Sequence, residues 1–304
     1  MSESPPTTPV CYRHPGRETY VRCTRCDRPI CPDCMRAASV GHQCPECVNE
    51  GRRSVRPART AFGGGAAGRH GYVTKALIAV NVLLMLLSIA SDRGGDAAVG
   101  GRGFGGLLGG STPLTDWGAV LGLAVFPDGT VGGVADGEWY RLVTAMFLHY
   151  GVLHLLLNMW ALWVLGRSLE ATLGPLRFLA LYLIAGFGGN VAAYLFSAQN
   201  AATAGASTAV FGLFAGIFVI MRRLGRDTSA ILPILVINLI FTFTVPSISI
   251  AGHLGGLVVG GLMALVLAYA PRSRRTLVQF AGGAIIVLIL LALALFRTAQ
   301  LLAG

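Results

Sequence analysis

Residues 205 to 221 read GASTAVFGLFAGIFVIM, and residues 251 to 261 read AGHLGGLVVGG. Both segments are apolar enough to enter a lipid bilayer, yet each carries a polar side chain of catalytic type near its start, Ser207 in the first and His253 in the second. Polar side chains at membrane depth are costly, so those that occur are candidates for function. Because both stand near the start of a segment, we expect them near one membrane face and at comparable depth.

Glycines recur at four-residue spacing in both segments. They are Gly212 and Gly216 in the first, and Gly252, Gly256 and Gly260 in the second. Small residues at this spacing let two helix backbones approach closely. Generic helix packing explains them equally well and is compatible with catalysis, because close packing is what would bring Ser207 to His253.

The composition places these segments in a polytopic membrane protein. The chain is 54% hydrophobic and only 12% charged, with a mean hydropathy of +0.64. Several apolar runs approach the roughly 20 residues that a membrane-spanning helix needs. We predict an all-α fold with seven spans, the fourth and fifth being the shortest: about 73–91, 142–165, 176–197, 206–221, 229–245, 251–270 and 279–296.

The arginines predict the orientation, because cytoplasmic loops retain basic residues near span ends. They gather before the first span and at alternate loops: Arg167 and Arg177, then Arg222, Arg223 and Arg226, then Arg272, Arg274 and Arg275. We therefore expect a multi-pass protein of the plasma membrane with a cytoplasmic N-terminus and an extracytoplasmic C-terminus. The net charge of +10 is then explained by topology and anionic-lipid contacts rather than by nucleic-acid binding.

All seven cysteines lie near the N-terminus, before the first span. With one histidine they form four pairs, each separated by two residues: Cys11 with His14, Cys23 with Cys26, Cys31 with Cys34, and Cys44 with Cys47. Eight ligands suffice for two tetrahedral zinc sites. His42 is a spare candidate that we expect beside a site. A disulfide framework is the alternative, which the reducing cytosol disfavours.

The predicted second span carries further polar residues. His154 and Asn158 are four residues apart, hence on one helical face and one turn from each other. Hydrogen bonding between helices without catalysis explains Asn158 alone equally well. The presence of Ser207 and His253 favours a functional interpretation.

Together these motifs resemble the rhomboid intramembrane serine proteases over roughly residues 72–297. The family pattern is His-x-x-x-Asn on the second span, Gly-x-Ser starting the fourth, and a histidine followed by glycines on the sixth. Here these are His154 with Asn158, Gly205 with Ser207, and His253 with Gly256 and Gly260. Tyr140 and Arg141 resemble the family's Trp-Arg element, and Glu170 matches a family position with an expected structural role. Thr208 departs from the usual glycine after the serine, and we expect it to affect rate or fit.

The resemblance implies a six-helix core with the seventh helix as an addition, and a serine endopeptidase that cuts transmembrane protein substrates in the lipid bilayer. His253 would be the base for Ser207, because a neutral imidazole can take up and return a proton near pH 7. Carboxylates are absent from the third to seventh spans, so we expect a dyad, with the histidine tautomer set by packing or a neutral hydrogen bond. Asn158, His154 and the Ser207 N–H group would stabilise the oxyanion.

The cysteine pairs resemble a B-box-type zinc finger, which implies that alternate pairs share a metal. Cys11, His14, Cys31 and Cys34 would then hold one zinc ion, and Cys23, Cys26, Cys44 and Cys47 the other. We expect a structural double-zinc module over residues 1–50, a flexible basic linker over 51–71, and the membrane domain over 72–304. The module would offer a surface to a cytosolic protein partner.

Two other classes of protein compete with a protease. One is a catalytically silent rhomboid relative that binds membrane clients, against which the intact Ser207, His253 and Asn158 argue. The other is a secondary transporter with a zinc-dependent head. It predicts charges in several spans or inverted repeats, and the sequence shows neither.

Overall fold

The computed structural model describes residues 8–55, 59–65, 70–92, 110–126, 128–245 and 248–303. The chain divides into two compact units, Met1–Ala58 and Arg59–Gly304. We call them the N-terminal unit and the membrane unit. The predicted domain ranges of 1–50, 51–71 and 72–304 stay a prediction.

The N-terminal unit has little regular structure. Its elements are a 3-10 turn η1 (Pro32–Cys34), two short antiparallel strands β1 (Arg36–Ala37) and β2 (His42–Gln43), and the helix α1 (Pro45–Ser54). Its buried core consists of Ile30 and six cysteines. Since a core of this kind buries little hydrocarbon, metal ions would have to stabilise the fold.

The membrane unit is helical, as predicted. Its long helices are α2 (Tyr72–Ser91), α5 (Val152–Leu173), α6 (Pro175–Phe196), α7 (Ser207–Arg223), α8 (Ile231–Thr244), α9 (Ile250–Tyr269) and α10 (Arg275–Ala303). Within the described residues, five of these segments are long and apolar enough to cross a membrane. The fourth and fifth predicted spans are indeed the shortest, because α7 has 17 residues and α8 has 14.

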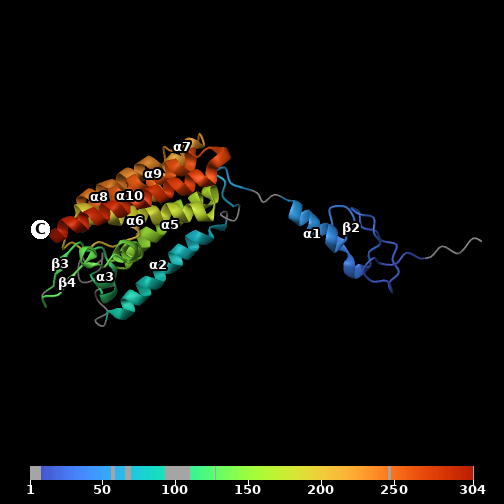
Figure 1. Ribbon diagram of the computed structural model, residues 1–304, viewed down its shortest axis with the longest axis horizontal. Helices are drawn as coiled ribbons and strands as arrows, with labels where there is room; N and C mark the ends of the chain where they lie inside the picture. Colours follow the sequence, from blue (N-terminus) through green and yellow to red (C-terminus); the bar gives the residue numbers. More distant parts are fainter. Residues whose placement is uncertain are drawn as a thin grey trace, which may run out of the picture. The chain divides into compact units, whose positions relative to one another are not determined.

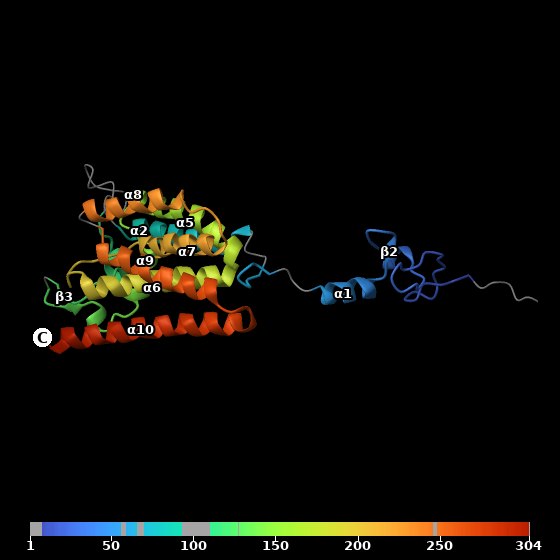
Figure 2. The same cartoon turned by 90° about the horizontal axis from the view of Figure 1, so that it is seen from above.

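Helices α6, α7 and α9 pack against one another at the centre of the membrane unit. Figure 1 shows α2 along one edge of the helix bundle. Figure 2 shows α10 on one side of this centre and α8 on the other. Glycines make the central contacts close: a Cβ at Gly256 would clash with the Thr208 carbonyl, and one at Gly260 with the backbone of Gly212. The predicted glycine-lined crossing of the fourth and sixth spans is therefore present.

The predicted second span begins too early. Residues 141–147 form a short helix α4 (Arg141–Thr144) and a 3-10 turn η5 (Ala145–Phe147), and α5 begins only at Val152. Gly151 separates them with a φ of 91°, which glycine adopts without strain. His149, predicted on the span, consequently lies in the turn before α5.

The segment before α5 folds around Arg141. It contains α3 (Pro113–Gly118), the antiparallel strands β3 (Ala124–Val125) and β4 (Val131–Gly132), and the 3-10 turn η4 (Val134–Asp136). The buried Arg141 side chain pairs with Glu138 at 2.7 Å and donates to the carbonyl oxygens of Asp116 and Ala119. Tyr140 stacks on Trp117 at 4.7 Å. These contacts join α3 and the residue that follows it to the start of α4.

Glu170 lies inside α5, because this helix continues to Leu173, beyond the end predicted for the second span at about residue 165. Its side chain is fully buried. Its carboxylate accepts hydrogen bonds from the N–H groups of Val73 and Thr74 and from the Thr74 hydroxyl, at 2.8 to 3.0 Å. The first turn of α2 lacks a side-chain cap of its own. Glu170 therefore caps α2 from a neighbouring helix, which is a structural role.

Part of the predicted linker is packed on the membrane unit. Phe62 is buried with the core of the bundle, and a Cβ at Gly64 would clash with the Leu173 carbonyl. The N–H of Gly64 donates to the Thr60 hydroxyl at 2.9 Å, which closes a tight turn. Residues 59–65 thus differ from the flexible chain expected over 51–71.

Candidate active site and metal sites

Ser207 and His253 are in direct contact, as the sequence predicts. The two residues lie in the first turns of α7 and α9, and Ser207 Oγ is 2.7 Å from His253 Nε2. Phe211, one turn after Ser207, stacks on the imidazole with a centroid distance of 4.1 Å and an interplanar angle of 20°. This packing fixes the plane of the ring so that Nε2 faces the hydroxyl.

Thr242 on α8 fixes the other side of the imidazole, and sequence reasoning missed it. Its Oγ1 lies 2.8 Å from His253 Nδ1 and also donates to the Asn238 carbonyl at 2.8 Å. Because the hydroxyl proton is directed at that carbonyl, Oγ1 accepts a hydrogen bond from the Nδ1–H group of His253. The network therefore assigns the tautomer with Nε2 unprotonated and able to accept the Ser207 proton. This is the neutral hydrogen bond that a dyad requires.

In the Ser–His protease that the sequence predicts, replacing Thr242 by valine should lower kcat for peptide cleavage by about tenfold to hundredfold with little change in KM. Valine keeps the volume but leaves the Nδ1 proton without an acceptor, so the productive tautomer loses its support. Thr242→Ser should restore most of the rate, since serine keeps the hydroxyl. Steady-state kinetics of the three proteins tests this, and equal rates for the valine and serine variants would contradict it.

Gly205 and two hydrogen bonds from backbone N–H groups position the loop before Ser207. Gly205 N–H donates to the Ala145 carbonyl at 2.9 Å, and Ala206 N–H donates to His149 Nε2 at 3.4 Å. Gly205 has a φ of 149°, and a Cβ there would lie 3.0 Å from His154 Nε2 and 3.2 Å from Ser207 Oγ. Glycine therefore keeps the space between His154 and the serine hydroxyl free.

His154 and Asn158 approach the same region from α5. His154 faces Gly205, and its ring meets that of His149 edge to face at 5.1 Å. Asn158 is buried and donates one Nδ2 hydrogen to the His154 carbonyl at 2.9 Å. An amide nitrogen carries two hydrogens, so one remains for another acceptor.

Thr208 lies at the crossing of α6, α7 and α9. A Cβ atom added to Gly189 would lie 2.6 Å from the Cβ of Thr208. A Cβ atom added to Gly252 would lie 3.2 Å from the Cγ2 of Thr208. Its buried Oγ1 has no hydrogen-bond partner within the described part of the chain. The extra volume of this residue is thus accommodated by glycines on the two neighbouring helices.

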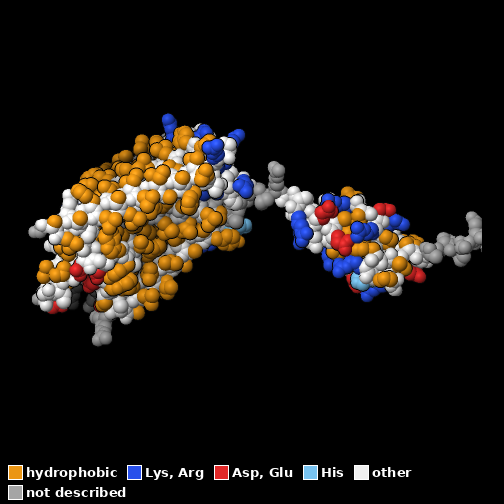
Figure 3. All heavy atoms as spheres, viewed as in Figure 1, with side chains coloured by type: hydrophobic (Ala, Val, Ile, Leu, Met, Phe, Trp, Pro, Cys, Tyr) orange, Lys and Arg blue, Asp and Glu red, His pale blue; other side chains and the backbone are white. Residues whose placement is uncertain are grey.

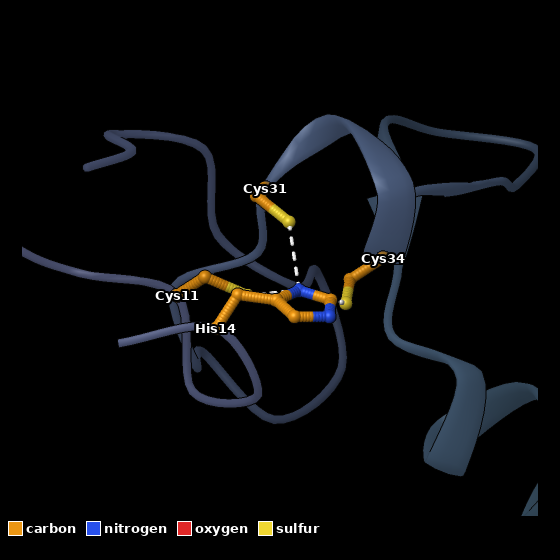
Figure 4. A group of neighbouring side chains, drawn as sticks. All are labelled: Cys11, His14, Cys31 and Cys34. Carbon is orange, nitrogen blue, oxygen red and sulfur yellow. Dashed lines mark hydrogen bonds between the residues drawn. The ribbon is translucent and has the colours of Figure 1, made fainter. Parts of the chain in front are cut away.

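Two groups of four side chains in the N-terminal unit could hold metal ions. Cys11, His14, Cys31 and Cys34 form one group, and Cys23, Cys26, Cys44 and Cys47 the other. Within each group the ligand atoms all lie within 4.8 Å of one another. Figure 4 shows the four side chains of the first group pointing at a common centre. His42 is exposed and belongs to neither group.

The distances fit a tetrahedral ion. A zinc ion about 2.3 Å from sulfur and about 2.0 Å from nitrogen separates two sulfurs by about 3.8 Å, and a sulfur from a nitrogen by about 3.5 Å. The Sγ atoms of Cys26 and Cys44 are 3.8 Å apart. His14 Nδ1 lies 3.2 Å from Cys31 Sγ, 3.5 Å from Cys34 Sγ and 3.8 Å from Cys11 Sγ.

Backbone N–H groups also point at the sulfurs. The N–H of Cys44 donates to Cys23 Sγ at 3.2 Å, and the N–H of Cys47 donates to Cys44 Sγ at 3.3 Å. Burial by itself raises the pKa of Cys23, but the backbone hydrogen bonds from Cys44, Arg25 and Cys26 outweigh it and lower the pKa to about 6. The thiolate, which is the form that binds metals, is thereby favoured at Cys23. In the same group, burial and the neighbouring cysteines raise the pKa of Cys47.

Comparison with known proteins finds relatives over the part of the chain that contains Ser207 and His253. The family model for the Rhomboid domain matches residues 136–270, a range that includes Ser207 and His253. The chain is 38% identical over 148 residues to rhomboid protease GluP of Bacillus subtilis (strain 168), which covers 46% of this chain and 28% of that protein. It is 36% identical over 149 residues to putative rhomboid protease YdcA of the same organism, covering 47% of this chain and 74% of that protein.

A plant relative is matched over a longer part of the chain. RHOMBOID-like protein 4 of Arabidopsis thaliana is 32% identical over 207 residues, covering 64% of this chain and 51% of that protein. The chain thus spans less than a third of GluP, about half of the plant protein and about three quarters of YdcA.

Proposed function

The chain belongs to the rhomboid family, and we propose that it is a serine endopeptidase that cleaves transmembrane segments of other membrane proteins. Two relatives bear the word protease in their names, which supports this class of activity. The observation that carries the proposal is the 2.7 Å contact between Ser207 Oγ and His253 Nε2. A nucleophile and a base within hydrogen-bond reach are what acyl transfer needs.

In the proposed reaction His253 relays one proton in each of two half-reactions. Ser207 Oγ attacks the scissile carbonyl carbon while its proton passes to Nε2, and the carbonyl oxygen becomes an oxyanion. The C–N bond then breaks, and Nε2 returns the proton to the leaving amine. Water next attacks the acyl-enzyme ester while Nε2 takes up its proton. Nε2 then gives that proton to Ser207 Oγ as the ester C–O bond breaks and the acid is released. Thr242 Oγ1 accepts a hydrogen bond from the Nδ1–H group throughout and so stabilises the imidazolium.

The oxyanion would be stabilised by donors from two helices. The candidates are the free Nδ2 hydrogen of Asn158, the His154 imidazole and the N–H of Ser207. Support comes from the position of His154 beside Gly205 and from the location of Ser207 at the start of α7, where the helix dipole is positive. Losing one such donor typically costs about 10²–10³ in rate.

For the N-terminal unit we propose two structural zinc ions held by the two four-residue groups. Their three-sulfur-one-nitrogen and four-sulfur ligand sets suit zinc. The unit would lie in the cytoplasm and bind a cytosolic protein, and the C-terminus would lie on the opposite side of the plasma membrane, in keeping with the arginine distribution.

Covalent labelling distinguishes a protease from a catalytically silent relative. A fluorophosphonate should label the parent protein on the peptide that contains Ser207, and Ser207→Ala should remain unlabelled. Ser197→Ala, a matched control at the end of α6, should be labelled like the parent. A parent protein that stays unlabelled on Ser207 while it binds membrane proteins would instead favour the client-binding alternative.

A further inference from the structure

Five arginines from three separate segments converge at one end of the membrane unit. Arg59 belongs to the packed segment 59–65, and Arg177 to the first turn of α6. Arg272 and Arg274 lie in the turn after α9, and Arg275 is the first residue of α10. Together with Thr60 and Ser273 they line a cavity of about 630 Å³. In Figure 3 basic side chains gather at this end, while the flanks of the helices are covered by apolar side chains.

Two of these arginines are held in place by neutral partners. Arg177 Nε donates to Gln279 Oε1 at 2.7 Å, and an Arg275 guanidinium nitrogen donates to the Ala61 carbonyl at 3.0 Å. Both side chains cross Gly63, because a Cβ there would lie 3.0 Å from Arg275 Cδ and 3.4 Å from a guanidinium nitrogen of Arg177. Two cations are thus fixed beside each other with most of their N–H groups still available.

The cluster lacks a balancing acid within the described part of the chain. The ion pairs recorded there involve other arginines: four lie in the N-terminal unit, and the fifth joins Arg141 to Glu138. Like charges this close repel each other, and the repulsion is relieved when an anion binds between them. Guanidinium groups present paired donors that match phosphate oxygens.

The cavity continues into an apolar surface. Leu277 lines it and is 65% exposed, and Phe280, one turn further along α10, is 77% exposed. Both lie on a helix that is long and apolar enough to span a membrane. A soluble phosphate would leave these side chains uncovered, whereas the acyl chains of a phospholipid would cover them. The ligand that fits both parts is therefore amphipathic.

We propose that this cavity binds the phosphate group of an anionic phospholipid headgroup, with Arg59, Arg177 and Arg275 as its central ligands. The bound phosphate joins the segment before α2 to the first turn of α6 and the start of α10. The cavity lies beyond the C-terminal end of α9 (Ile250–Tyr269), whereas His253 lies in the first turn of that helix. The site would therefore exist whether or not the chain is a protease.

The test uses the full-length protein in nanodiscs that contain equal amounts of phosphatidylglycerol and phosphatidylcholine. Native mass spectrometry should show phosphatidylglycerol retained by the parent, and Arg177→Gln/Arg275→Gln should lower that retention at least about tenfold. Arg222→Gln/Arg226→Gln removes the same charge from the end of α7, outside the cavity, and should retain lipid like the parent. Equal losses in both double variants, or no preference for phosphatidylglycerol, would overturn the proposal.

Two further measurements complete the test. One distinguishes loss of the site from misfolding, and the other distinguishes a lipid phosphate from a soluble phosphate. Arg272→Gln/Arg274→Gln alters exposed side chains that line the cavity, and it should weaken retention severalfold without lowering the thermal stability in detergent. Inorganic pyrophosphate should displace little phosphatidylglycerol. If pyrophosphate binds the lipid-free parent tightly and phosphatidylglycerol is not retained, the ligand is a soluble phosphate and the lipid assignment is wrong.

Discussion

Replacing His253 by alanine should reduce the cleavage of a transmembrane substrate by at least about 10⁴-fold. Among the described residues, the His253 imidazole is the one base within hydrogen-bond distance of Ser207 Oγ. No carboxylate of the seven long helices contacts that hydroxyl. Without the imidazole the hydroxyl must lose its proton unaided in a site of low dielectric. The rate should be measured in proteoliposomes with purified protein and substrate.

His70→Ala is the matched control for this variant. His70 is exposed and stacks on Tyr72 at the start of α2, so its loss removes an imidazole without touching the dyad. We expect the control to cleave at the parental rate. Parental cleavage by His253→Ala would show that another group serves as the base and would remove the dyad mechanism.

Removal of metal from the N-terminal unit should unfold it while the membrane unit stays folded. Structural zinc sites contribute apparent binding free energies of about 10–16 kcal/mol near neutral pH, far more than the small core of Ile30 and cysteines can supply. Hydrogen exchange of the full chain should show residues 11–47 losing protection on chelation, and α5 to α10 unchanged.

Zinc analysis of two histidine variants sharpens this prediction. The parent should hold two zinc ions, one for each group of ligands. His14→Ala should lose about one of them, whereas His42→Ala should keep both, because His42 lies outside the groups. Less than one zinc ion in the parent, with protection that chelators do not change, would exclude the structural role.

The membrane spans, the glycine-lined crossing of the fourth and sixth spans, and the closely spaced cysteine pairs could be predicted, because each leaves a local pattern in the sequence. The contact of Ser207 with His253 follows from where their helices begin, and the alternate pairing of cysteines follows from the resemblance to a zinc finger. The start of the second span was wrong because residues 142–165 are mostly apolar and contain no Asp, Glu, Lys or Arg to mark a boundary. Only the positive φ of Gly151 reveals the break, and sequence alone does not specify it.

Thr242 shows what the sequence conceals. It is a threonine among other threonines in an apolar segment, and its role depends on α8 meeting α9 at one point. Among the described residues of α8 it is the one that is buried. Its polarity in a membrane helix was the available signal. Threonine is too common in such helices, and too readily bonded to its own backbone, for that signal to identify it.

The packed segment 59–65 was missed for a similar reason. Its three glycines and one arginine suit a flexible linker. Phe62 nevertheless inserts into the bundle, and Gly64 fits against the end of α5. One buried aromatic ring and one close backbone approach outweigh the composition. Both depend on helices that lie far away in the sequence.

The central claim, that Ser207 is the nucleophile of a membrane protease, is tested most directly by cleavage of a purified single-span reporter in proteoliposomes. The parent protein should release fragments cut within the transmembrane segment, and Ser207→Ala, reconstituted at equal amount and shown to be folded, should release none. Fragments of the same sequence and at the same rate from Ser207→Ala would contradict the account.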